Sequence, residues 1–172
     1  MVKRVLLFYC VIQLVGLDTF AQSDDMFSIF LVRHSEKEQM SDDSFDLPLS
    51  KCGKQRSVAL SSFLSEVHLD VVYSTDFTRT KHTALPTADK KGIEISLYND
   101  QDIRSFSTHL IENRQNALVV GHSNTTGVLA GLLANQKVED IELHIYDYIY
   151  QVVFFGESRV LNLFHSNFEC VQ

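Results

Sequence analysis

The feature that most constrains this chain is the alternation of short apolar runs with longer helix-forming segments. Apolar runs of strand-like length stand at residues 27–32, 69–73, 93–98 and 117–120. The segments that follow them predict helices at residues 51–67, 77–90, 101–113 and 125–134. Pro86 lies inside the second of these helices, where a kink or a break is expected. Strands that alternate with helices indicate a parallel sheet covered on both faces.

The last part of the chain has a different pattern. Three β-rich runs follow one another there, at residues 141–145, 149–155 and 159–164. They predict antiparallel additions at one edge of the sheet. We therefore expect an α/β fold, a three-layer α/β/α sandwich with a mostly parallel central sheet and antiparallel C-terminal edge strands. In such sheets, ligands bind outside the carboxyl ends of the strands.

Arginine and histidine recur at those strand ends. Arg33 and His34 follow the first predicted strand, Arg79 lies shortly after the second, and His122 follows the fourth. A single Arg-His pair is usually a feature of the surface. The same residue types beyond three strands whose ends share one edge predict a common site.

These residue types suit the chemistry of phosphate. An Arg side chain presents a planar fork of donors that matches phosphate oxygens, and it stays charged at any working pH. Two Arg and a protonated His could neutralise a dianionic phosphoryl group. A second, neutral His can attack phosphorus if its other ring nitrogen is held by a hydrogen bond, most simply to a backbone carbonyl. Because neighbours in a strand point to opposite faces, Arg33 and His34 share a site only if the strand ends or distorts there.

Four sequence blocks resemble the histidine phosphatase superfamily, also called phosphoglycerate mutase-like. The blocks are residues 31–37 (LVRHSEK), 49–56 (LSKCGKQR), 72–84 (VYSTDFTRTKHTA) and 119–123 (VVGHS). They are similar to the family's Arg-His signature, its helix start, its second motif and its second-histidine motif, in that order. Ser35 stands where the family usually has Gly or Ala, and His82 stands where Gln is common.

The resemblance implies a phosphatase of the histidine acid type, a phosphoric monoester hydrolase. His34 would become phosphohistidine, and Arg33, Arg79 and His122 would bind the phosphoryl group and stabilise the transition state. No metal ion or organic cofactor is implied. The partner would be a small-molecule phosphate ester or a phosphoprotein.

The acid that protonates the leaving oxygen is less clear from the sequence. In the branch that contains the mutases it follows the third strand, where this chain has no Glu but has Asp100 and Asp102. Asp100 is the first choice and Asp102 the second. Glu36, two residues from the predicted nucleophile, is a third candidate. Both Asp residues could instead cap the following helix.

Two other functions compete with phosphomonoester hydrolysis. A phosphomutase could use the same scaffold, although the chain lacks a long insertion after the third strand that would resemble a mutase lid. A catalytically silent module that binds phosphate or a phosphoprotein is the alternative from another class. The formal net charge of -7 argues against a nucleic acid partner, which usually needs a broad basic face.

The first residues predict export. Lys3 and Arg4 precede an apolar run that ends near a small residue, Ala21, which indicates a signal peptide at residues 1–21 and a catalytic domain at 22–172. We expect a secreted or periplasmic protein with no stable membrane insertion after cleavage. In an oxidising compartment Cys52 and Cys170 could pair, or they could be two separate thiols.

Overall fold

The structure is a computed structural model that describes residues 26–39 and 45–170. The predicted signal peptide lies outside the described residues. The elements follow the order β1 Met26–Arg33, α1 Lys51–Phe63, β2 Val71–Ser74, α2 Thr78–Lys91, β3 Ile95–Leu97, α3 Ile103–Asn113, β4 Ala117–Gly121, α4 Thr126–Ala134, β5 Tyr148–Phe155 and β6 Ser158–His165.

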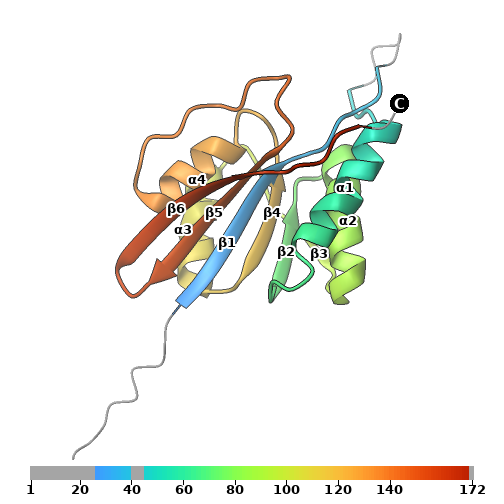
Figure 1. The fold of residues 1–172 in the computed structure, drawn as a ribbon. Helices are drawn as coiled ribbons and strands as arrows, with labels where there is room; N and C mark the ends of the chain where they lie inside the picture. Colours follow the sequence, from blue (N-terminus) through green and yellow to red (C-terminus); the bar gives the residue numbers. More distant parts are fainter. Residues whose placement is uncertain (1–25, 40–44, 171–172) are drawn as a thin grey trace, which may run out of the picture.

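The six strands form one sheet in the order β3-β2-β4-β1-β5-β6. The pairs β2–β3, β2–β4 and β1–β4 are parallel, whereas β1–β5 and β5–β6 are antiparallel. Helices α1 and α2 cover one face of the sheet, and α3 and α4 cover the other (Figure 1). The predicted three-layer architecture with antiparallel C-terminal edge strands is confirmed.

The central strands are apolar on both sides because both faces are buried. In β1, Ile29 and Leu31 belong to the core under α3 and α4, whereas Phe30 and Val32 belong to the core under α1 and α2. This alternation follows from the period of two in a strand. It explains why the central strands appear in the sequence as continuous apolar runs.

Helix α2 passes through Pro86 without a break, so the break considered from the sequence does not occur. A proline cannot donate to the carbonyl four residues earlier, which weakens a helix locally. Ala84 and Ala88, on either side of Pro86, are buried in the core that α2 shares with α1. The helix ends at Gly92, which has the left-handed conformation (φ 66°) that glycine adopts readily.

The predicted strand at residues 141–145 is wrong. This segment is a loop between α4 and β5. Its backbone groups pair outside the sheet: the amide of Ile141 donates to the carbonyl of Ser123, and three carbonyls accept from Arg33. A buried guanidinium therefore takes the hydrogen bonds that a neighbouring strand would otherwise satisfy.

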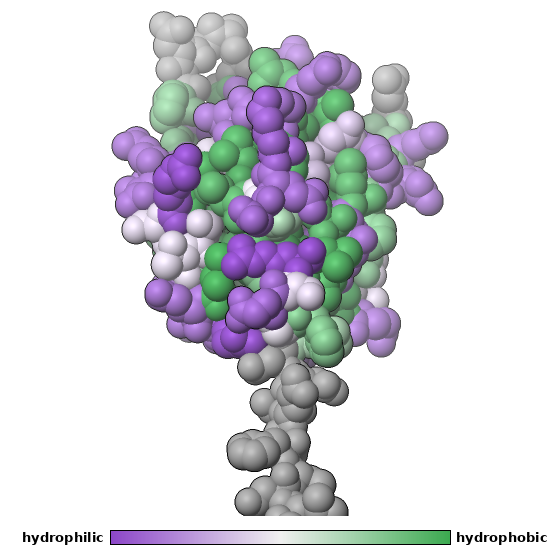
Figure 2. Space-filling model, turned by 90° about the vertical axis from the view of Figure 1, so that its left-hand side faces the viewer, coloured by the Kyte–Doolittle hydropathy of each residue, from purple (hydrophilic) through white to green (hydrophobic). Residues whose placement is uncertain are grey.

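The edge strand β6 is only partly covered, with Val160, Leu163 and Phe164 exposed. On the face that Figure 2 shows, hydrophobic residues lie interspersed with hydrophilic ones. Within the described residues, no helix has the length and apolar character needed to cross a membrane.

Candidate active site

A cleft of about 400 Å³ opens at the carboxyl edge of the parallel strands. All five residues predicted for the site line it, from the ends of β1 and β4, the start of α2 and the loop after β3. The full lining is Arg33, His34, Lys37, Phe45, Phe77, Arg79, Asp100, His122, Ser123, Asn124, Leu143 and Tyr146.

Arg33 and His34 share this cleft because β1 ends between them. Arg33 is the last residue of the strand. The amide of His34 still donates to the carbonyl of Gly121 at 2.9 Å, which keeps the chain against β4 for one more residue. Neighbouring side chains of a regular strand point to opposite faces, so Arg33 and His34 can share a cleft only because the strand ends at this pair.

The imidazole of His34 is buried and held by its own backbone neighbour. Its Nδ1 lies 2.8 Å from the carbonyl oxygen of Ser35. A carbonyl only accepts, so Nδ1 carries the proton and Nε2 keeps its lone pair in the neutral ring. The pKa of His34 is lowered to about 3, mainly by burial and also by the charges of Arg33 and Arg79, against the opposing effect of the Ser35 carbonyl. The ring is therefore neutral near pH 7.

Arg33 is fixed by the loop between α4 and β5. Its Nη1 donates to the carbonyls of Glu142, Leu143 and Ile145 at 3.2, 2.9 and 2.9 Å. Its guanidinium carbon lies 4.1 Å from the centre of the Tyr146 ring. Nε of Arg33 is buried without a hydrogen-bond partner. The role of this loop is not predictable from the sequence, because an apolar stretch does not indicate that its carbonyls bind an Arg.

Arg79 is held from the other side of the cleft. Its Nη1 lies 3.4 Å from the carbonyl of Phe45 and 3.7 Å from Oδ1 of Asp46, and its guanidinium lies over the Phe77 ring. Asp46 also accepts from the amide and the hydroxyl of Thr78 at the start of α2. One carboxylate thus caps the helix and orients the Arg on its first turn. Asp46 is a residue that the sequence analysis missed.

His122 lies beside His34, with their ring centroids 5.5 Å apart. Its Nε2 lies 3.1 Å from the hydroxyl of Thr75 and 3.5 Å from Oδ2 of Asp100. The pKa of His122 is lowered to about 4, mainly by burial and also by the Arg79 charge, while Asp100 opposes the shift. An arriving phosphate dianion would raise this pKa, because it adds negative charge that offsets the charges of Arg33 and Arg79.

The three candidates for the proton donor have different surroundings. Asp100 lines the cleft. Asp102 caps helix α3, with its side chain accepting from the amide of Ser105 at 3.2 Å. Glu36 forms an ion pair with Arg56 at 2.7 Å. Only Asp100 of the three borders the cleft, so the capping role considered for both Asp residues applies to Asp102.

The comparison with known proteins agrees with this geometry. The family model of the histidine phosphatase superfamily (branch 1) matches residues 29–108, which contain Arg33, His34, Arg79 and Asp100. Residues 29–108 are thus similar to the histidine phosphatase superfamily. Phosphoserine phosphatase 1 of Hydrogenobacter thermophilus is 39% identical over 74 residues, 41% of this chain. That match spans 35% of the relative's own length.

Solved structures of histidine phosphatases share the fold. The protein histidine phosphatase SixA complexed with tungstate has a TM-score of 0.70 at 18% identity, over 81% of this chain and 97% of that chain. The alpha-ribazole phosphatase from Shigella flexneri has a TM-score of 0.68 at 16% identity, over 85% of this chain and 100% of that chain. At these identities the likeness establishes the fold.

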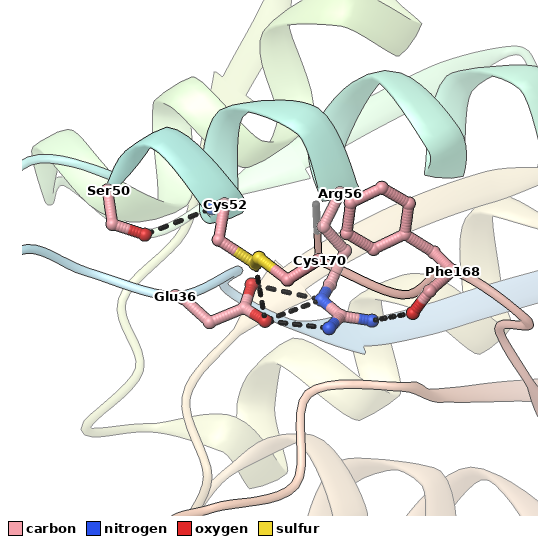
Figure 3. The surroundings of a disulfide bond; sticks show 7 residues. Glu36, Ser50, Cys52, Arg56, Phe168 and Cys170 are labelled. Atoms are coloured by element: carbon pink, nitrogen blue, oxygen red, sulfur yellow. Dashed lines mark hydrogen bonds and ion pairs between the residues drawn. A yellow bond between two sulfur atoms is a disulfide. The ribbon is translucent and has the colours of Figure 1, made fainter. Parts of the chain in front are cut away.

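A disulfide lies beside the segment that carries the nucleophile candidate. Cys52 at the start of α1 is bonded to Cys170 near the end of the chain (Figure 3). Beside this bond, the Arg56 guanidinium donates to the Glu36 carboxylate. The same guanidinium lies over the Phe168 ring and donates to the backbone carbonyl of Phe168. The sequence left the pairing of the two cysteines open, and the fold brings their Cα atoms to 5.5 Å.

The helix-start motif, residues 49–56, has a packing reason in this structure. Ser50 caps α1 by accepting from the amide of Gly53 at 3.1 Å. A Cβ at Gly53 would collide with the backbone carbonyl of Glu36. Glycine thus lets α1 approach the segment after His34 closely.

The remaining lining residues are polar and less buried. Lys37 and Asn124 are exposed and Ser123 is half-buried. Helix α4 is capped at Thr125, so Ser123 and Asn124 face the cleft without serving as its N-cap. Within residues 26–39 and 45–170, no group of three or more His, Cys, Asp or Glu is arranged to hold a metal ion.

Proposed function

We propose that this protein is a histidine phosphatase that hydrolyses phosphate monoesters through a phosphohistidine intermediate on His34. The observation that carries the proposal is the hydrogen bond from Nδ1 of His34 to the Ser35 carbonyl. It fixes the ring and its tautomer, and it leaves Nε2 as the nucleophilic nitrogen in a cleft with two Arg.

In the first step, the lone pair of Nε2 attacks phosphorus and the ester P–O bond breaks. The departing oxygen takes a proton from Asp100, the carboxyl group of the cleft. Arg33 and Arg79 hold the phosphoryl oxygens, with His122 beside them. The products of this step are the free alcohol and phosphohistidine.

In the second step, water attacks phosphorus and the P–N bond breaks. The Asp100 carboxylate takes the proton from water, so the residue returns to its initial state. His34 recovers its neutral ring because the proton stays on Nδ1 throughout, where it is hydrogen-bonded to the Ser35 carbonyl oxygen. The sum of both steps is ester plus water giving alcohol plus inorganic phosphate.

Rapid quenching tests this mechanism. Brief incubation with a ³²P-labelled ester and quenching without acid should trap label on His34, in an acid-labile and fairly base-stable bond. His34→Ala should lose both label and turnover, whereas His68→Ala, a histidine with a side chain 79% exposed, should keep both. Retention of most of the turnover in His34→Ala would contradict the covalent route. Binding of phosphate without hydrolysis across a broad panel would favour the silent binding module.

We further propose that the chain is exported and cleaved after Ala21, to a secreted or periplasmic location. The basic start, the apolar run and Ala21 support this proposal. The Cys52–Cys170 disulfide supports it independently, because disulfides persist in oxidising compartments. Mass spectrometry of the natively produced protein should find Gln22 as the first residue. An intact Met1 would contradict the proposal.

A further inference from the structure

Aromatic rings form a continuous series from the floor of the cleft to its mouth. The His122 ring lies 5.5 Å from the His34 ring and 5.1 Å from the Phe77 ring. The Phe77 ring in turn lies 5.4 Å from the Phe45 ring. These centroid separations lie in the range of favourable ring contacts. The series therefore connects the reacting histidine with the surface.

The outermost ring of this series is largely in water. Phe45 is 81% exposed, and Leu143, another lining residue of the same cleft, is 74% exposed. Folding gains little from a ring in this position, because most of its surface stays hydrated. Large apolar side chains at the mouth of a polar cleft are typical of surfaces that contact a ligand.

The charges of the cleft direct the organic part of a substrate towards these rings. Arg33, Arg79 and His122 surround the place of the phosphoryl group at His34. In an in-line displacement the leaving group departs on the side of phosphorus opposite the attacking nitrogen. The organic group then lies away from His34. The Phe77 ring is close to this region, since it contacts both the Arg79 guanidinium and the His122 ring.

We propose that Phe45 and Phe77 form a subsite for the organic group of the substrate, which is a small phosphate monoester carrying a planar ring. The inference rests on the proposed phosphate site. The cleft of about 400 Å³ has the size of small-molecule sites. A planar ring packs on these two side chains, whereas a short polar alcohol gains no contact with them.

Binding of two phosphonates, which cannot be hydrolysed, tests the subsite directly. 2-Phenylethylphosphonate and ethylphosphonate share the anionic group and differ in the ring. Titration calorimetry should show a Kd about tenfold lower for the ring compound. Phe45→Ser should remove most of this preference, and Phe45→Tyr, which keeps a ring, should retain it. The backbone carbonyl of residue 45, which accepts from Arg79, remains in both variants.

The matched control is Phe155→Ser. Phe155 is 56% exposed at the end of β5, paired with Met26, the first residue of β1, whereas the cleft lies beyond the last residue of β1. This variant removes an exposed phenyl ring from the far end of the sheet. It should leave the Kd values of both phosphonates unchanged.

The corresponding esters, 2-phenylethyl phosphate and ethyl phosphate, separate this inference from the proposed hydrolysis, because both release a primary alcohol. Turnover of both esters without a ring preference in Kd or kcat/KM overturns the subsite and leaves hydrolysis standing. A ring preference in Kd that Phe45→Ser removes, with neither ester hydrolysed, supports the subsite and overturns hydrolysis. A preference that Phe45→Ser leaves intact, or the failure of 2-phenylethylphosphonate to bind, overturns the subsite.

Discussion

Oδ2 of Asp100 lies 3.5 Å from Nε2 of His122, which places a carboxyl group directly beside the His pair of the cleft. Asp100 comes from the loop after β3, and His122 follows β4. Two residues that are separate in the chain thus bring the proposed proton donor beside the proposed phosphate site.

Asp100→Asn should slow esters with poor leaving groups far more than p-nitrophenyl phosphate. The nitrophenolate ion needs little protonation, whereas an alkoxide does, so the loss for an alkyl ester should be about 10²-fold or more. Asp102→Asn, at the helix cap, is the matched control and should lower stability without this dependence on leaving group. Steady-state kcat on both ester types measures the effect. Equal slowing of the two esters by Asp100→Asn would mean that Asp100 is not the acid.

The stability of the protein should fall as the pH is lowered from about 7 to about 4. Burial lowers the pKa of His34 from 6.5 to about 3, so in this window the unfolded chain binds a proton that the folded chain does not. The free energy of unfolding therefore increases as the pH rises through this window and decreases as the pH falls through it. Urea denaturation across this range should show a smaller loss in His34→Asn. The control His82→Asn, at an exposed position on α2, should show the wild-type loss. The same loss in His34→Asn and wild type would contradict this assignment.

Tyr146→Ala should weaken the binding of inorganic phosphate by about tenfold. The Tyr146 ring stacks on the Arg33 guanidinium at 4.1 Å, a contact worth about 0.5–2 kcal/mol. Tyr146→Phe should bind nearly as well as wild type, because the ring remains and the lost hydrogen bond is long, at 3.4 Å. Titration calorimetry distinguishes them. If the two variants bind phosphate equally weakly, the hydroxyl and not the ring positions Arg33.

Removal of the Cys52–Cys170 disulfide should lower the free energy of unfolding. The bond closes a loop with a sequence separation of 118, for which the chain-entropy relation gives about 4–5 kcal/mol as an upper value. The double variant Cys52→Ser, Cys170→Ser should therefore unfold at a lower urea concentration than the oxidised wild type. Reduced wild type serves as the control and should match the double variant. Equal midpoints for oxidised and reduced wild type would show that the bond adds no stability.

Local signals in the sequence predicted most of the elements and four of the five proposed site residues, and the fifth, Asp100, was the first of three candidates. Apolar runs such as 117–120 form strands between two cores, and the motifs that follow them hold Arg33, His34, Arg79 and His122 at strand ends. The topology of a parallel sheet then requires these ends to share one edge. The residues of the cleft floor were therefore predictable from the sequence alone.

The error at residues 141–145 has a different origin. Apolar and β-favouring residues indicate a strand, but strand formation also needs a free partner edge. Here the carbonyls of Glu142, Leu143 and Ile145 bind Arg33, which is more than 100 residues away in the chain. No local pattern records such a partner.

The sequence by itself determined which residue types meet at the carboxyl edge of the sheet, where Arg and His suit a phosphoryl group. The tertiary structure alone decided how they are held and which neighbours join them. It placed Asp100 on the cleft and assigned Glu36 to Arg56, and it joined Cys52 to Cys170. These choices depend on packing between distant segments. Such contacts form only when the whole core is buried, so no local pattern in the sequence predicts them.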